Sequence, residues 1–130
     1  MVKKKNIQEI ASVAEPIVIE ESSSTGSLRR SLEEVKTYEG VIGYILRNST
    51  SAAIDLGDPT RIIDYAILSS SAFDANKELS ELFDLGNTKS ILIEAKSIKV
   101  LSLLLDDSRV SIFMDRNADH KKIMKKLHVL

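Results

Sequence analysis

Side chains that could carry out chemistry are few in this chain. The two histidines, His120 and His128, lie eight residues apart near the C-terminal end. We interpret both as lying on the last predicted helix, roughly two turns apart, whereas a helical metal site places its histidines four residues apart. There is no cysteine, and no serine has a histidine and an acid beside it in the local sequence. We therefore predict no catalytic residues, no metal site and no cofactor, and expect that the protein is not an enzyme.

Carboxylate pairs and glycine motifs have structural interpretations. Asp106-Asp107 suits the tip of a hairpin, and Asp115 with Asp119 suits the start of a helix. Neither glycine pattern of the common nucleotide-binding loops is present. The stretch Gly40-Val41-Ile42-Gly43 has the letters of an RNA-clamping GXXG loop, but its apolar centre predicts the start of a strand. We interpret Gly40 as a helix-to-strand break and Gly43 as a point of close packing.

Length and composition indicate one domain with a real core. The chain has 130 residues, of which 43% are hydrophobic, and its net charge is −1. This charge argues against a nucleic-acid partner, whose binding surface would be basic. No apolar run approaches the roughly 18 residues that a membrane helix needs, and no apolar segment follows the basic N-terminus as in a signal peptide. We expect a cytoplasmic protein without an integral membrane segment.

Four lysines cluster near the C-terminus, in a segment predicted to be helical. They are Lys121, Lys122, Lys125 and Lys126. Cations are favourable near the C-terminal end of a helix, so a solvated helix face explains them. The alternative is an electrostatic patch for an acidic partner or a membrane surface.

The N-terminal residues 1–26 differ from the rest of the chain. A short helical spacing ends at Pro16, Ile17-Val18-Ile19 is extended in character, and the next residues are acidic and then serine-rich. We interpret residues 1–26 as a flexible or loosely docked tail, and residues 27–130 as the folded domain. The alternative is a peptide that docks on a groove or a sheet edge of a partner.

The remaining chain predicts the order helix, two strands, helix, three strands, helix. Leu28, Leu32 and Val35 mark the first helix, with Ser27 as a possible cap. Strands are expected at 41–46, 52–56, 89–95, 98–105 and 110–114, and the last helix carries Ile123, Met124 and Leu127. Several strands are apolar on both faces. A five-stranded antiparallel sheet with helices on both faces, an α+β sandwich within the α/β class, accounts for this.

A long helix predicted over Asp58–Gly86 is the central element of this order. Asp58 and Pro59 suit its start and Gly86 its end. Its first half is apolar on nearly every side, which indicates burial on more than one side. We expect one face to cover the sheet, and the other to meet a second chain. The sheet-facing set is Leu68, Ala72, Ala75, Leu79 and Phe83; the set facing a second chain is Ile63, Ile67, Ser70, Ser71 and Asp74.

Three features together resemble the Roadblock/dynein light chain family. They are the order of elements, the Glu39-Gly40-Val41-Ile42-Gly43 opening of the first strand, and Asp115-Arg116-Asn117-Ala118 before an amphipathic last helix. The resemblance covers about residues 28–127, and members often place a glycine in the first hairpin, which Asn48-Ser49-Thr50-Ser51 lacks. It implies a profilin/longin-like fold and a homodimer, or a heterodimer with a paralogue. The long helices would pair, and the strands with Ile91 and Ile93 would join edge to edge.

The resemblance also implies a function, because family members are non-catalytic adaptors and regulators of small Ras-like GTPases or light chains of the dynein motor. The leading hypothesis is a dimeric scaffold that binds a small GTPase, with Arg61 and Asp64 as candidate contacts to it. One alternative is a structural light-chain-type subunit of a motor or larger assembly. Another is a small-molecule sensor, which would require a closed apolar pocket.

Overall fold

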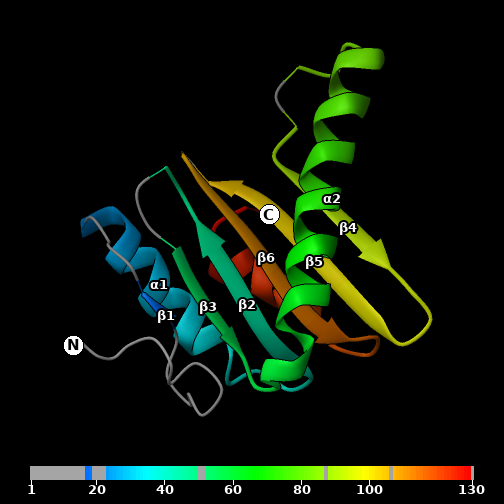
Figure 1. Ribbon diagram of the computed structural model, residues 1–130. Helices are drawn as coiled ribbons and strands as arrows, with labels where there is room; N and C mark the ends of the chain where they lie inside the picture. Colours follow the sequence, from blue (N-terminus) through cyan, green and yellow to red (C-terminus); the bar gives the residue numbers. More distant parts are fainter. Residues whose placement is uncertain (1–16, 19–22, 50–51, 87, 106, 130) are drawn as a thin grey trace.

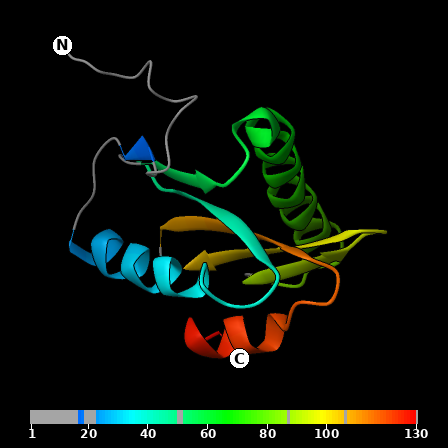
Figure 2. The same cartoon turned by 90° about the horizontal axis from the view of Figure 1, so that it is seen from below.

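The computed structural model describes residues 17–18, 23–49, 52–86, 88–105 and 107–129, and it consists of a sheet between two helical layers (Figure 1). The elements in chain order are β1 (Ile17–Val18), α1 (Ser23–Val35), β2 (Val41–Arg47), β3 (Ala52–Leu56), the 3-10 turn η2 (Pro59–Arg61), α2 (Ile62–Leu82), β4 (Ser90–Glu94), β5 (Ile98–Leu105), β6 (Ser108–Asp115) and α3 (His120–Lys126). Helix α2 covers one face of the sheet, and α1 and α3 cover the other (Figure 2).

The sheet contains the five predicted strands and one more. Its order is β1-β3-β2-β6-β5-β4, and every neighbouring pair is antiparallel. The prediction of a five-stranded antiparallel sheet between helices is confirmed for β2 to β6. The additional strand β1 is only two residues long, with Ile17 opposite Ile54 and Val18 opposite Ala53 on the outer side of β3. Two residues are too few for a periodic signal, so this pairing could not be read from the sequence.

Strand alternation divides the core into two clusters, one on each face of the sheet. On β6, Ile112 and Met114 point toward α1 and α3, and Phe113 between them points toward α2. The larger cluster includes Leu32, Val35, Tyr44, Leu46, Leu101, Leu103, Val110 and Ile123. The smaller cluster lies under α2 and consists of Ile45, Leu56, Tyr65, Val100 and Phe113. Tyr65 stacks on Phe113 with ring centroids 4.5 Å apart.

Two glycines fix the chain between α1 and the sheet. Gly40 adopts a left-handed conformation with φ +86°, which confirms it as the break between helix and strand. Gly43 lies against β3, where an added Cβ would come within 2.1 Å of the Asp55 carbonyl oxygen. The predicted close packing at Gly43 is therefore confirmed, and its partner is the neighbouring strand.

Helix boundaries differ from the predictions at three ends. The helix α1 begins at Ser23 rather than near Ser27, so it includes residues assigned to the tail. Asp58 accepts a hydrogen bond from the Thr60 amide, but the cap opens a 3-10 turn before α2. At the other end α2 stops at Leu82, and Asp84, with φ +53°, takes the left-handed position expected for Gly86. The proposed domain boundary after residue 26 stays a prediction, since most of the tail lies outside the described residues.

None of the helices in the described ranges is long and apolar enough to cross a membrane.

Candidate functional site

The outward face of α2 carries an exposed apolar stripe. Ile63 and Ile67, one turn apart, are 72% and 61% exposed, and Ser70, Ser71 and Asp74 extend the same face and are also exposed. The structure thus brings together the five α2 residues predicted to meet a second chain. That they do so stays a prediction. Leaving two isoleucines in water forfeits ~1.5–3 kcal/mol for each side chain, so this face is suited to association.

The sheet-facing side of α2 is different from the prediction. Its buried residues are Tyr65, Ser69, Ala72, Phe73 and Asn76. Two of these are polar and have partners across the interface: Ser69 shares a 2.6 Å hydrogen bond with Ser111, and the Asn76 amide donates to the Thr88 carbonyl at 3.3 Å. The assignment of Ala72 to this side is correct, and Leu68 is half-buried beside it. The assignment of Ala75, Leu79 and Phe83 was wrong, because all three are exposed.

Leu79 and Phe83 are exposed because α2 overhangs the sheet, whereas Ala75 lies mid-helix on an exposed flank. A helix of 21 residues is about 31 Å long, whereas even the eight-residue strands β5 and β6 span only about 26 Å. The C-terminal end of α2 therefore projects beyond the sheet (Figure 1). Leu82 and Phe83 there are 69% and 67% exposed, and Leu79 and Leu85 are exposed as well. The length mismatch was the sequence signal that could have revealed this overhang.

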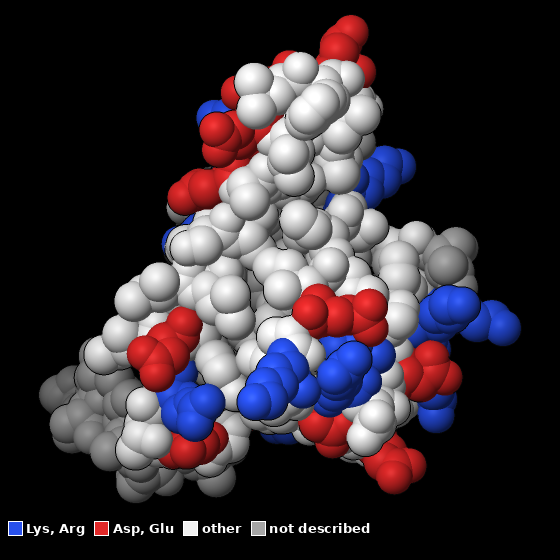
Figure 3. Space-filling model, turned by 90° about the vertical axis from the view of Figure 1, so that its right-hand side faces the viewer, with Lys and Arg blue, Asp and Glu red and all other residues white. Residues whose placement is uncertain are grey.

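The strand β4 forms the open edge of the sheet beside this overhang. It pairs with β5 on one side, and no other described strand pairs with it on the other. Ile91 and Ile93 are half-buried, and Ile93 packs on the cluster under α2. Figure 3 shows this side, where largely uncharged surface runs from the projecting helix down over the body. Acidic atoms gather along one flank of the helix (Figure 3).

The two candidate contacts to a GTPase lie at the other end of α2. Arg61 and Asp64 are both exposed, and the Arg61 guanidinium lies 5.5 Å from the centre of the Tyr65 ring. Stacking on the ring orients Arg61 while its hydrogen-bond donors stay accessible. Their role in binding a partner stays a prediction.

A charged network joins α1 to the sheet on the opposite face. The Tyr44 hydroxyl donates a 2.5 Å hydrogen bond to Glu33, and the Lys36 ammonium contacts both Glu33, at 3.5 Å, and the buried Asp55 carboxylate. Burial alone would raise the pKa of Glu33, but Tyr44 and Lys36 favour its ionised form and lower that pKa. Burial alone would lower the pKa of Lys36, but the contact with Asp55 raises it. All four groups are satisfied by one another, so the network is structural.

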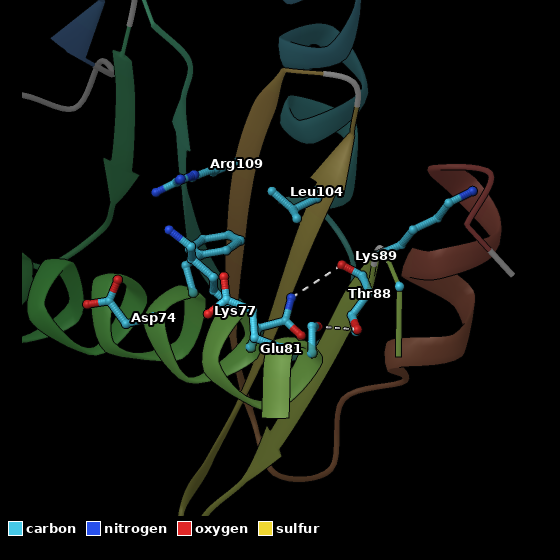
Figure 4. Close-up of a pocket in the computed structure, with 11 residues that line it drawn as sticks. Asp74, Lys77, Glu81, Thr88, Lys89, Leu104 and Arg109 are labelled. Carbon is cyan, nitrogen blue, oxygen red and sulfur yellow. Dashed lines mark hydrogen bonds between the residues drawn. The ribbon is translucent and has the colours of Figure 1, made fainter. Parts of the chain in front are cut away.

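A hollow of about 640 Å³ lies between the C-terminal half of α2 and the sheet (Figure 4). Phe73 and Leu104 line it together with charged side chains, among them Lys77, Glu81 and Arg109. This lining does not resemble the closed apolar pocket that a small-molecule sensor would require.

Comparison with known proteins finds similarity of structure but not of sequence. No family model and no curated protein matches the sequence. A Roadblock/LC7 domain from Streptomyces avermitilis superposes with a TM-score of 0.62 at 15% identity, over 76% of this chain and 87% of that one. MglC from Myxococcus xanthus superposes with a TM-score of 0.55 at 17% identity, over 79% of this chain and 92% of that one. This chain has the Roadblock/LC7 fold.

The two motifs that carry the family resemblance lie against each other in this Roadblock/LC7 fold. The Asp115 amide donates a 2.8 Å hydrogen bond to the Gly40 carbonyl. A Cβ on Gly40 would come within 2.9 Å of the Ala118 Cβ. The motifs therefore have a packing role, since they join the start of β2 to the turn before α3.

The histidines and lysines of the C-terminal segment are separated by the fold. His120 begins α3 and lies 3.0 Å from the buried Lys99 ammonium, whereas His128 follows the helix end with φ +61°. The interpretation that both histidines lie on the last helix was therefore wrong for His128. Among the lysines, Lys122 lies over the Tyr38 ring and Lys126 pairs with Glu34 at 3.0 Å. In the part of the chain that the structure describes, no three His, Asp or Glu side chains are grouped to hold a metal ion.

Proposed function

We propose that this chain is a non-catalytic dimeric scaffold that binds and regulates a small Ras-like GTPase in the cytoplasm. The observation that supports it most is the continuity of an exposed apolar helix face with an open sheet edge. Ile63, Ile67 and Leu82 lie on α2, and the unpaired side of β4 lies beside the helix. The resemblance to the Roadblock family, in which these two elements pair, supports the same assignment.

The overhang enlarges the proposed dimer surface beyond the five predicted residues. At 100° per residue, Ala75, Leu79 and Leu82 lie on the flank of α2 that continues from Leu68, which packs in the cluster with Ile93. A second copy would cover this flank together with Ile63 and Ile67. The partner could be an identical chain or a paralogue with the same apolar flank.

The dimer is tested by placing charge on the proposed interface. Because two buried lysines would lack partners, we expect the double variant Ile63→Lys, Ile67→Lys to be monomeric or insoluble. Light scattering coupled to size exclusion measures the mass. The matched control is Ser27→Lys with Ser49→Lys, which adds the same charge at exposed positions outside α2. An unchanged dimer mass in the isoleucine variant would place the interface elsewhere.

The GTPase is tested by mixing the protein with GTPases from the same cell, each loaded with GDP or with a GTP analogue. We expect a complex with at least one of them, a preference for one nucleotide state, and an altered rate of nucleotide hydrolysis or exchange. A complex that forms equally well with the GDP-loaded and the GTP-analogue-loaded GTPase would favour the structural-subunit alternative. Finding neither a complex nor a changed rate of nucleotide hydrolysis or exchange with any of them would reject the GTPase proposal. The proposal of a dimer would not be affected by that result.

A further inference from the structure

The hollow beside α2 combines an apolar floor with cations from two different elements. Phe73 of α2 and Leu104 of β5 form the apolar part, and Arg109 of β6 and Lys77 of α2 extend toward the same end of the hollow (Figure 4). The Arg109 guanidinium lies 5.7 Å from the centre of the Phe73 ring. A cation–π contact at this distance restrains the guanidinium while leaving its donors free for an acceptor.

A second arginine lies next to Arg109 on the sheet. Arg47 of β2 is directly opposite Arg109 in the antiparallel register, so both side chains leave the same face of the sheet. Like charges in this position repel each other. Both arginines are exposed at the end of the sheet. Neither guanidinium forms a hydrogen bond or ion pair with any residue that the structure describes, and Arg109 has only its contact with the Phe73 ring. An anion between them would turn this repulsion into two attractive contacts.

The hollow adjoins the proposed dimer surface at Asp74, which lines the hollow and also belongs to the set predicted to meet a second chain. Phe73 and Lys77 lie on one flank of α2, and the apolar flank with Ala75 and Leu79 lies on the other, roughly 160° away around the helix axis. Figure 1 places β4, the proposed dimer edge, on the far side of α2 from β6, which carries Arg109. The end of the hollow that carries Arg109 would therefore stay open after two copies associate through β4 and this apolar flank.

We propose that this hollow is a docking site for an acidic segment of a partner protein in which an apolar side chain lies between two carboxylates. The apolar side chain would contact Phe73 and Leu104, and the carboxylates would pair with Arg109, Arg47 and Lys77. Arginine is suited to this because its fork binds a carboxylate through two parallel hydrogen bonds. The proposal goes beyond the GTPase hypothesis and does not rest on it, since any partner carrying such a segment would bind.

The charge around the hollow favours a short acidic peptide over a polyanion. Asp74 and Glu81 also line the hollow, and the chain as a whole has a net charge of −1. Nucleic acid presents one phosphate per nucleotide and would meet these carboxylates. A peptide with two carboxylates can place them at Arg47 and Arg109 and direct its uncharged backbone toward Asp74 and Glu81.

The test uses the full chain labelled with ¹⁵N and a capped peptide with the sequence Gly-Asp-Leu-Asp-Gly. We expect saturable chemical-shift changes at the backbone amides of Ser80 and Leu104 and at the Arg109 side chain. Matched peptides replace both Asp by Asn, or Leu by Ser, and each should bind about tenfold more weakly because it loses the charged or the apolar contacts. Inorganic phosphate at the same concentration is the comparison ligand.

Variants of the protein show whether the binding is at the proposed residues. Arg47→Gln and Arg109→Gln should each weaken binding about tenfold, and Arg30→Gln, on the exposed surface of α1, should leave it unchanged. Thermal unfolding confirms that each variant is folded, and Arg47→Gln keeps the test valid if loss of the Phe73 contact unfolds Arg109→Gln. The proposal is overturned if the Asn peptide or phosphate binds as tightly as the Asp peptide, or if Arg47→Gln has no effect.

Discussion

The hydroxyl groups of three serines meet between α2 and the sheet. Ser111 of β6 is fully buried and shares hydrogen bonds with Ser69 of α2 at 2.6 Å and with Ser102 of β5 at 3.1 Å. A serine in the middle of a helix is usually a sign of a solvated face. Here the polar residue faces the core, and its partners come from strands far away in the sequence.

Removing the Ser111 hydroxyl should therefore lower the stability of the fold by more than the loss of one small group suggests. We expect Ser111→Ala to lower the free energy of unfolding by about 1–3 kcal/mol, because Ser69 and Ser102 would lose a buried partner. Urea denaturation followed by circular dichroism measures it. Ser70→Ala, on the exposed face of the same helix, is the control and should change the free energy by less than about 0.5 kcal/mol. Equal effects of the two substitutions would contradict the buried network.

The lowered pKa of Glu33 predicts a pH dependence of stability. A carboxylate whose pKa is lower in the folded state stabilises the fold above its ordinary value of 4.5, and this contribution is lost as the pH falls through the lowered value. We expect Glu33→Gln to be less stable than the native chain at pH 7, by under about 1 kcal/mol because the side chain is 41% exposed. The difference should shrink below pH 4.5. Denaturation midpoints from pH 2.5 to 7 check this, and a constant difference would contradict it.

At the scale of elements, the pairing of β2 with β3 depends on one missing side chain. Gly43 lies so close to β3 that a Cβ would overlap the Asp55 carbonyl oxygen and approach the Leu56 Cα within 2.9 Å. Both neighbours are backbone atoms, so no side-chain rotation can relieve the contact. The register of β2 with β6 also shifts between Val41 and Gly43.

We expect Gly43→Ala to destabilise the fold by about 3 kcal/mol or more, because the two strands would have to separate. Gly57→Ala is the matched control, since a Cβ there has nothing within 4 Å. Thermal unfolding distinguishes them. A similar melting temperature for both variants would mean that β2 can move away from β3 without loss of stability.

The strands and the layers were predictable, whereas the orientation of α2 was not. Alternation located β2 to β6 within about two residues at each end, because each strand has at least one buried face. The face of α2 was misassigned because apolar Leu79 and Phe83 were expected in the core, whereas polar Ser69 and Asn76 are among the residues buried there. The partners that allow Ser69 and Asn76 to be buried, Ser111 and Thr88, lie on other elements. The Arg47–Arg109 pair was missed for the same reason, since only strand register brings these residues together.

At the scale of the whole molecule, the two edges of the sheet differ. The outer sides of β1 and β4 both lack a partner among the described strands, but β1 is two residues long and β4 is five. A very short edge strand offers little backbone to another chain. In an antiparallel ladder, hydrogen-bonded and non-hydrogen-bonded residue pairs alternate, so either Ile17 or Val18 supplies the backbone groups that bond β3. Prolines at both positions would remove this donor whichever residue carries it.

We expect the double variant Ile17→Pro, Val18→Pro to uncover the β3 edge and to produce species larger than a dimer, because an exposed strand edge pairs readily with another chain. Light scattering at several protein concentrations measures the distribution of masses. The double variant Ile17→Thr, Val18→Thr keeps the backbone groups of both residues and is the control. A variant that stays at the native mass would show that β1 does not protect this edge.

The short strand β1 also has a consequence for stoichiometry. A subunit with two open sheet edges corresponds to a bifunctional monomer in polymer chemistry. Each added subunit leaves a new open edge, so the assembly continues to grow. With β1 in place the subunit is monofunctional, because a two-residue edge strand is too short to pair with another chain, and a single edge-to-edge addition through β4 uses up both free ends. In the proposed assembly, two residues ahead of the main sheet would therefore act as a chain terminator that limits the product to two copies.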